Sequence, residues 1–188
     1  PLTDGIELVD LAVWGVGLEQ QPPSAVRVLE RAYDPTSPMD VPRRFHVAFE
    51  FDGGLELHLR TADQDSLTFQ GETGSIRVGA QEYVASAVEL NEFFPQRNER
   101  AADYGDVWDS FWASLRLGRA LLINAETSYR AVALVDLAHT ALQLNRGFRL
   151  VEGTDQPTDE AARRLMIRPL RAPHYLLTRS VMPSNHNG

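Results

Sequence analysis

The 188-residue sequence predicts an α+β fold, in which an open, mainly antiparallel β-sheet has helices packed on one face. Two observations support this prediction. Residues 44–78 contain two successive hairpins with alternating apolar and polar side chains, as in an antiparallel meander. In residues 4–17 and again after residue 106, apolar side chains recur at helical spacing. Strands grouped in one part of the chain and helices in others are typical of this class.

The strands are expected at residues 25–33, 44–51, 55–59, 66–70 and 75–78. The glycine-containing segments 52–54 and 71–74 supply the hairpin turns. One face of the first hairpin is apolar, and helices of residues 106–145 are expected to cover it: Phe45, Val47, Phe49, Phe51, Leu55, Leu57 and Leu59. The opposite face is polar: Arg44, His46, Glu50, Glu56, His58 and Arg60.

Helices are predicted before and after the strands in the sequence. The first covers residues 4–17, with Gly15 and Gly17 as its stop. The second spans residues 107–115 and ends at Gly118. A longer helix is expected to begin at Asn124 as N-cap, to run to Leu144 and to be capped by Gly147. After a short strand at 148–151, residues 158–160 carry the signal for a last helix.

Length and composition indicate a single domain and exclude several kinds of functional site. The length fits one α+β domain at 1–175, followed by a flexible tail at 176–188. A net charge of −8 disfavours nucleic acid as a partner. The chain has no cysteine, and its eighteen basic residues are all arginine. Thiolate metal sites, Schiff-base chemistry and a phosphate-binding lysine are therefore excluded on this chain.

No membrane partner is expected, because the longest apolar run, residues 131–135, is far shorter than a bilayer-spanning helix. The first residues lack the basic and apolar regions of a signal peptide, and we expect a cytoplasmic protein. The sequence also begins at Pro1, without methionine and within what looks like a motif, which is consistent with a processed or excised fragment as well as with a complete gene product.

Neither a nucleotide nor a metal site is predicted. The segment from Gly15 to Gly17 begins like a dinucleotide fingerprint, but it lacks the third glycine and follows a helix rather than a strand. None of the five histidines has a partner at metal-ligand spacing. His46 and His58 could face each other across the first hairpin, where cross-strand polar pairing is the commoner reason for such a pair.

Five segments, in this order, resemble the C-terminal domain of the glucose–fructose oxidoreductase / inositol dehydrogenase (Gfo/Idh/MocA) family. Residues 5–17 resemble the family's helix Gly-x-His-x-x-Asp-x-Ala-x-Trp, which is followed by glycines. Residues 49–54 and 69–78 resemble its two sheet hairpins, and 111–119 resemble the helix that ends in Gly-Arg. Residues 161–173 are similar to the closing stretch of a bacterial subgroup.

The resemblance implies an oxidoreductase that acts on the CH–OH groups of a sugar or polyol. Its cofactor, NAD or NADP, would be bound by an N-terminal Rossmann domain that this chain does not contain. The chain alone is therefore expected to bind no cofactor and to be inactive, with a Rossmann domain as a possible partner. Family members commonly associate through the sheet, which implies a homo-oligomer.

The candidate catalytic residues are Asp10 and Glu7. In the resembled motif, a histidine and an aspartate lie beside the reacting carbinol. Glu7 occupies the histidine position, and Asp10 retains the aspartate. From the residues alone, two carboxylates at i, i+3 could face one cleft, or they could only complement the dipole of a helix start.

Two functions follow as alternatives. The first is the substrate-binding and oligomerisation domain of an NAD(P)-dependent sugar or polyol oxidoreductase. The second is a stand-alone, non-catalytic module for carbohydrate binding or dimerisation. The order of the motifs favours the first function, and the second is the alternative that the absent fingerprint, the absent lysine and the replacement of histidine by Glu7 motivate.

Overall fold

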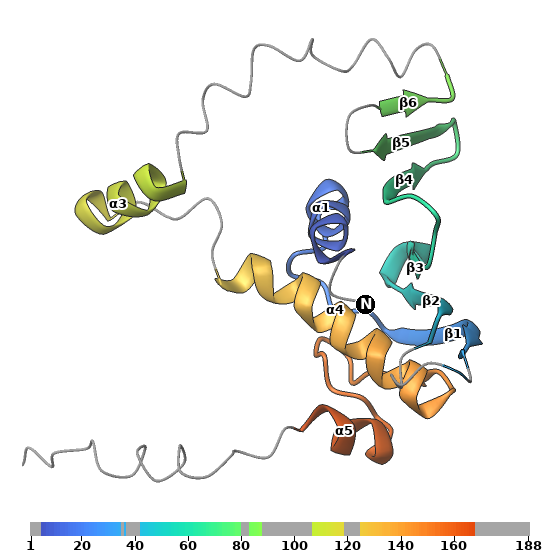
Figure 1. Cartoon of the computed structure of the whole chain (residues 1–188). Coiled ribbons are helices and arrows are strands. Elements are labelled where there is room, and N and C mark those ends of the chain that lie inside the picture. Colours follow the sequence, from blue (N-terminus) through green and yellow to red (C-terminus); the bar gives the residue numbers. More distant parts are fainter. Residues whose placement is uncertain are drawn as a thin grey trace, which may run out of the picture.

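The computed structural model describes residues 5–34, 36, 42–79, 83–87, 107–118 and 125–167, and it confirms the α+β fold (Figure 1). The chain forms these elements in order: α1 (Ile6–Val16), β1 (Ala25–Ala32), β2 (Arg44–Glu50), the short 3-10 turn η2 (Asp52–Gly54), β3 (Glu56–Arg60), β4 (Ser66–Gln70), β5 (Ser75–Gly79), β6 (Tyr83–Ala85), α3 (Val107–Leu117), α4 (Ala125–Leu144), β7 (Phe148–Arg149) and α5 (Glu160–Met166). The predicted N-cap Asn124 and the predicted tail 176–188 lie outside the described residues.

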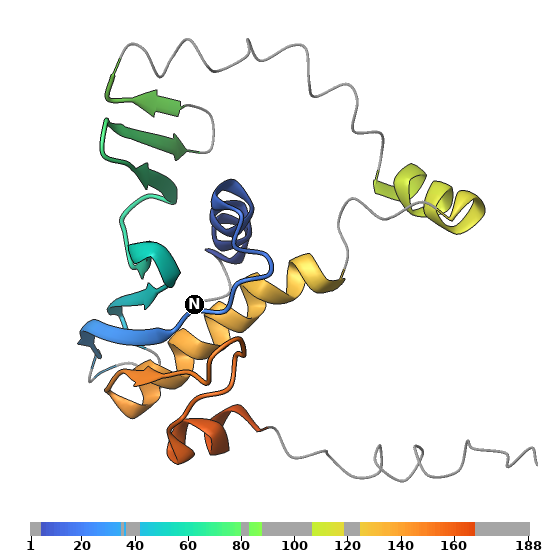
Figure 2. The same ribbon diagram turned by 180° about the vertical axis from the view of Figure 1, so that it is seen from behind.

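The strands form two antiparallel sheets rather than one continuous sheet. The first has the order β3-β2-β1-β7 and the second the order β4-β5-β6. The ladder breaks between Arg60 and Ser66, where residues 61–65 are all exposed. The side chains of this connection are solvated, and β3 and β4 form no ladder with each other. The two strands nevertheless lie next to each other, edge to edge (Figures 1 and 2).

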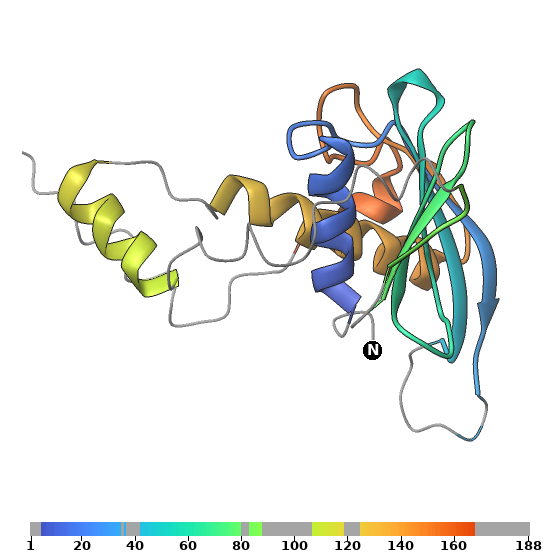
Figure 3. The same ribbon diagram turned by 90° about the horizontal axis from the view of Figure 1, so that it is seen from above.

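The core lies between the first sheet and two helices, α1 and α4, which are on the same side of the strands (Figure 3). We call this side of the sheet its inner face and the opposite side its outer face. Val47 and Phe49 on the inner face are fully buried, as the alternation predicts. Helix α3 stands apart from both sheets, so the covering helices are α1 and α4 and not the whole of 106–145.

The helix α1 ends as a Schellman motif. Gly17 adopts a left-handed conformation, with φ of 71°, and the N–H of Leu18 donates to the carbonyl of Val13 at 2.9 Å. Gly15 was expected to share in the stop, but it lies inside the helix. Its missing side chain instead leaves room for the ring of Phe69 on β4.

At the end of α4, too, the residue that ends the helix is not the predicted one. Asn145, with φ of 54°, is the left-handed residue that follows the helix, in place of the predicted cap Gly147. Gly147 is needed for another reason: a Cβ at this position would lie 2.4 Å from the carbonyl oxygen of Val26. The bare backbone therefore lets the chain return beside β1, where it forms β7.

A β-bulge interrupts the pairing of β1 with β2. The register shifts between Val28 and Glu30, so Leu29 is the extra residue, and its side chain is exposed. Beyond the bulge, Glu30 stands opposite His46 on the outer face, and Arg31 stands opposite Phe45 on the inner face. Arg31 there donates a hydrogen bond to the carbonyl of Leu142 near the end of α4.

The last helix begins as the sequence predicts. Asp159 is the N-cap of α5, and its carboxylate accepts a hydrogen bond from the N–H of Ala162. Ala162 is fully buried where α5 packs against α4. Within the described ranges, no helix is both long and apolar enough to cross a membrane.

Candidate functional site

A cleft of about 490 Å³ lies where the edges of β3 and β4 face helix α1. The helix contributes an apolar wall that includes Leu8 and Ala12. The strands and their connection contribute polar side chains: His46, Glu56, His58, Arg60, Gln64, Asp65, Ser66, Thr68 and Gln70. An apolar wall with a rim of donors and acceptors suits a small ligand that carries both C–H and O–H groups.

The candidate catalytic residues lie outside this cleft. The α1 side chains that line it are those of residues 8, 9, 12 and 16, whereas Glu7 and Asp10 are exposed elsewhere on the same helix. The i, i+3 spacing does bring the two carboxylates to one side of α1, as expected. Their catalytic role stays a prediction.

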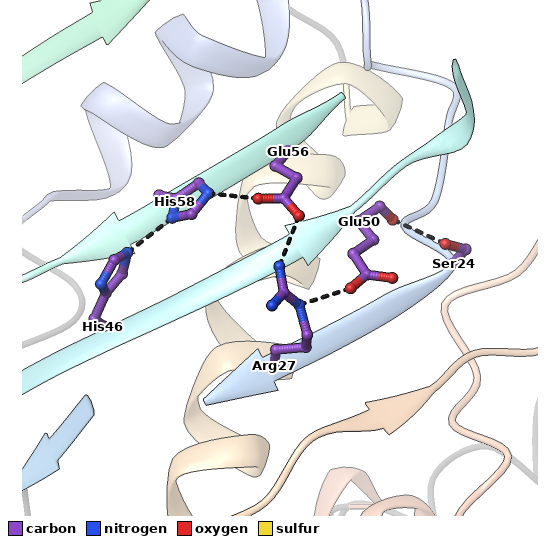
Figure 4. A network of polar contacts seen from close by, with 6 residues as sticks. All are labelled: Ser24, Arg27, His46, Glu50, Glu56 and His58. Carbon is purple, nitrogen blue, oxygen red and sulfur yellow. Dashed lines mark hydrogen bonds and ion pairs between the residues drawn. The ribbon is translucent and has the colours of Figure 1, made fainter. Parts of the chain in front are cut away.

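The outer face of the first sheet carries a chain of polar contacts (Figure 4). His46 Nε2 lies 2.8 Å from His58 Nδ1, and His58 Nε2 lies 2.9 Å from Glu56 Oε2. The other oxygen of Glu56 accepts a hydrogen bond of 2.6 Å from Arg27. Arg27 also pairs with Glu50, through Nε at 2.6 Å. The predicted cross-strand histidine pair is therefore present.

The hydrogen bonds of this polar network determine which atoms of its side chains carry protons. The hydrogen bond from His58 lowers the pKa of Glu56, with the charge of Arg27 as a further cause, so Glu56 is a carboxylate near neutral pH. It can only accept, so His58 Nε2 must donate. In a neutral His58, Nδ1 is then an acceptor, and His46 Nε2–H donates to it.

His46 is held in its neutral form. Partial burial is the largest cause of its lowered pKa, followed by the neighbouring charges of His58 and Arg60. Glu30, its cross-strand neighbour, acts in the opposite direction without cancelling these effects. The pair therefore resists the uptake of a second proton.

A third polar cluster joins α4 to the segment before α5. The guanidinium of Arg130, whose side chain is 8% exposed, pairs with Asp155. Burial, followed by the negative charge of Asp155, raises the pKa of Tyr129. The sequence analysis missed this cluster. The available signal was an arginine four residues before the core residue Leu134, in the buried stripe of a helix.

A metal site is not evident in the part of the chain that the structure describes. No group of three or more histidine, aspartate or glutamate side chains there could hold an ion. The two histidines of the outer face converge without such a third ligand.

Comparison with known proteins supports the fold. No family model and no curated protein matches the chain. Among solved structures, it is similar to aldose-aldose oxidoreductase from Caulobacter crescentus complexed with glycerol, with a TM-score of 0.53 and 14% identity. That enzyme is a Gfo/Idh/MocA family member. The match covers 78% of this chain and 46% of that chain, so this chain spans less than half of the oxidoreductase.

Proposed function

We propose that this chain is the substrate-binding and oligomerisation domain of an NAD(P)-dependent oxidoreductase that acts on CH–OH groups of a sugar or polyol. The observation that carries the proposal is the fold similarity to an aldose-aldose oxidoreductase, together with the motif order in the sequence. The cofactor would be bound by a Rossmann domain, either in the same protein or on a second chain.

The cleft beside α1 is where we place the sugar or polyol. Its rim offers the guanidinium of Arg60, the carboxylate of Asp65 and the hydroxyl of Thr68. These groups can accept from and donate to neighbouring hydroxyls, while the wall of α1 contacts the C–H groups. The solved oxidoreductase was complexed with glycerol, a ligand of this chemical kind.

Glu7 and Asp10 then act at the junction with the cofactor domain. Both carboxylates are exposed on α1, whose other side chains form the wall of the cleft. A docked domain would remove water from around them, and a desolvated carboxylate is a stronger base. Since neither carboxylate lines the cleft, either residue can accept the proton of a carbinol only where the substrate extends beyond the cleft to this side of α1.

Calorimetric titration with glycerol and a panel of aldoses tests the cleft. We expect binding by the wild-type chain and at least about a tenfold loss in Thr68→Trp, which puts a large ring into the rim. Thr73→Trp is the matched control, because Thr73 is an exposed residue of the β4–β5 turn that does not line the cleft. Equal effects of the two substitutions, or no binding by the wild type, would contradict the cleft as the site.

A second experiment separates this proposal from a stand-alone binding module, which the exposure of Glu7 and Asp10 favours. The chain should bind no NADH alone, since no described helix starts with a phosphate-binding glycine turn. When it is joined to a cofactor domain, Glu7→Gln and Asp10→Asn should lower turnover and leave sugar affinity nearly unchanged. Unchanged turnover in both variants would remove these residues from the catalytic machinery.

A further inference from the structure

The cleft beside α1 continues past the edge of the first sheet to its outer face. β3 is the last strand of that sheet, and side chains from both of its faces line the cleft: Leu57 and Leu59 from the inner face, and Glu56, His58 and Arg60 from the outer face. His46, on the neighbouring strand β2, lines it as well. We call the part of the cleft at His46 and Arg60 its outer end.

The guanidinium of Arg60 is uncompensated at this outer end. The other outer-face arginines of β1 and β2 differ in this respect: Arg27 has two carboxylate partners, and Arg44 lies 3.8 Å from Glu30. Arg60 forms no ion pair with any carboxylate in the part of the chain that the structure describes. Its positive charge is therefore available to an anion that enters the cleft.

His46 places a hydrogen-bond acceptor beside this cation. The two residues stand opposite each other in the pairing of β2 with β3, a position that brings Cβ atoms to within about 5 Å. Burial and the charges of His58 and Arg60 lower the pKa of His46, so its ring is neutral near neutral pH. Because Nε2–H donates to His58, the acceptor of the neutral ring is Nδ1. Within the described residues, no hydrogen bond occupies that atom.

We propose that the outer end of the cleft binds the acid end of a polyhydroxy carboxylate, with the carboxylate on Arg60 and the hydroxyl of the adjacent carbon on His46 Nδ1. The inference rests on the proposed function and deepens it, because it names a sugar acid as the substrate class within the sugars and polyols.

A carboxylate with a neighbouring hydroxyl offers the two groups that this end can bind. The carboxylate accepts two parallel N–H bonds from the planar guanidinium of Arg60, and the hydroxyl donates to His46. A neutral polyol can make hydrogen bonds with the same side chains, but it leaves the charge of Arg60 uncompensated. The acid should therefore bind more tightly than the polyol with the same carbon chain.

The charge of the cleft favours a carboxylate over a phosphate ester. A phosphate monoester carries about 1.5 to 2 negative charges near neutral pH. Among the described residues that line the cleft, Arg60 is the one arginine, and the chain has no lysine. Of the two acids in the lining, Glu56 is engaged by Arg27 and His58, whereas Asp65 forms no ion pair with a described residue. Asp65 would repel a second negative charge, and it can accept from hydroxyls farther along the ligand.

Calorimetric titration of the full chain at about pH 8, above the ordinary pKa of histidine, tests the proposal. D-gluconate is the probe, and D-sorbitol is its neutral reference, because the two differ only in the carboxylate at the first carbon. We expect gluconate to bind at least about tenfold more tightly than sorbitol, since hydrogen bonds between charged groups are the stronger ones. Sorbitol 6-phosphate should bind less tightly than gluconate.

Two variants of Arg60 and its control separate a local charge from the charge of the whole chain. Arg60→Gln should abolish the preference for gluconate and change the affinity for sorbitol by less than about threefold. Arg77→Gln is the matched control, because Arg77 is exposed on β5 and does not line the cleft. It should keep the preference, although it removes the same charge.

The role of His46 is tested with 2-deoxygluconate, which lacks the hydroxyl beside the carboxylate. His46→Leu should weaken the binding of gluconate by about tenfold and leave the binding of 2-deoxygluconate nearly unchanged. His46→Asn, whose side-chain oxygen lies near the place of Nδ1, should retain most of the affinity for gluconate. Circular dichroism of each variant checks that it is folded.

The outcomes distinguish this inference from the proposed function. Absence of binding by sorbitol and gluconate alike contradicts the cleft as the substrate site, and with it the proposed function. Equal affinity for the two ligands contradicts the sugar acid and leaves the proposed function standing. Tighter binding of sorbitol 6-phosphate than of gluconate contradicts the choice of a carboxylate. Equal losses in Arg60→Gln and Arg77→Gln contradict the assignment to Arg60, and equal effects of His46→Leu on gluconate and 2-deoxygluconate contradict the contact with His46.

Discussion

The ring of Phe69 rests directly on the backbone of α1 at Gly15: a Cβ added to Gly15 would lie 2.7 Å from Cζ of that ring. This contact joins the second sheet to the helix that packs on the first. The cleft lies beside this contact, because Phe69 and Ala12 both line it.

Gly15→Ala should therefore destabilise the protein, although alanine is the better helix former. Overpacking costs about 1–3 kcal/mol, and the gain in helix propensity is about 1 kcal/mol, so we expect a net loss of up to about 2 kcal/mol. Gly5→Ala is the control, since nothing lies within 4 Å of its added Cβ. Urea unfolding measures both. The interpretation is wrong if Phe69→Ala does not relieve the effect of Gly15→Ala.

Gly147→Ala should be more damaging. The added Cβ would lie 2.4 Å from the Val26 carbonyl and 3.2 Å from the Arg27 Cα, and backbone atoms of a central strand cannot move aside as a ring can. We expect a loss of about 2–4 kcal/mol in the free energy of unfolding. Asn145→Gly, at the nearby position with φ of 54°, should change stability by no more than about 0.5 kcal/mol. Similar values for both substitutions would contradict this distinction.

Asp155→Asn should cost about 2–4 kcal/mol, because it leaves the buried guanidinium of Arg130 without its counter-ion. The Nε of Arg130 already has no hydrogen-bond partner in the described structure. The pKa of Tyr129 should fall toward its ordinary value of 10, which a spectrophotometric titration would record. Glu160→Gln removes a partner from exposed ion pairs and should cost less than about 0.5 kcal/mol.

The acid limb of the stability profile should depend on Glu56. Its pKa is lowered in the folded state, so its contribution is fully present above its ordinary value of 4.5 and is lost as the pH falls through the folded pKa. Glu56→Gln should lower the melting temperature most above pH 4.5, where the contribution is fully present, and should make the melting temperature depend less on pH below this value. An unchanged acid limb would show that the folded structure does not favour the ionised form of Glu56.

Local patterns were enough to predict the strands and their faces. The alternation that puts Val47 and Phe49 inside and His46 and His58 outside is a property of the strand itself. The start of α5 at Asp159 is also local, since the cap acts on the next turn of the same chain.

What the sequence could not predict depends on neighbours from elsewhere in the chain. The roles of Gly15 and Gly147 are set by Phe69 and Val26, which come close only in the folded protein. Helical spacing put Glu7 and Asp10 on one side of α1, but it could not indicate which side faces the cleft. That depends on the packing of the whole helix.

The bulge at Leu29 links two elements electrostatically. The last turn of α4 contains no basic residue, although a helix ends with a partial negative charge that a cation stabilises. Arg31 supplies that cation from β1, by donating to the carbonyl of Leu142. The side chain of Arg31 lies on the inner face, three residues after the inward-facing Val28, because the extra residue Leu29 shifts the alternation by one position. If β1 paired with β2 without this bulge and kept Leu29 in the ladder, strict alternation would turn Arg31 to the outer face, and the end of α4 would lose the cation that compensates its dipole.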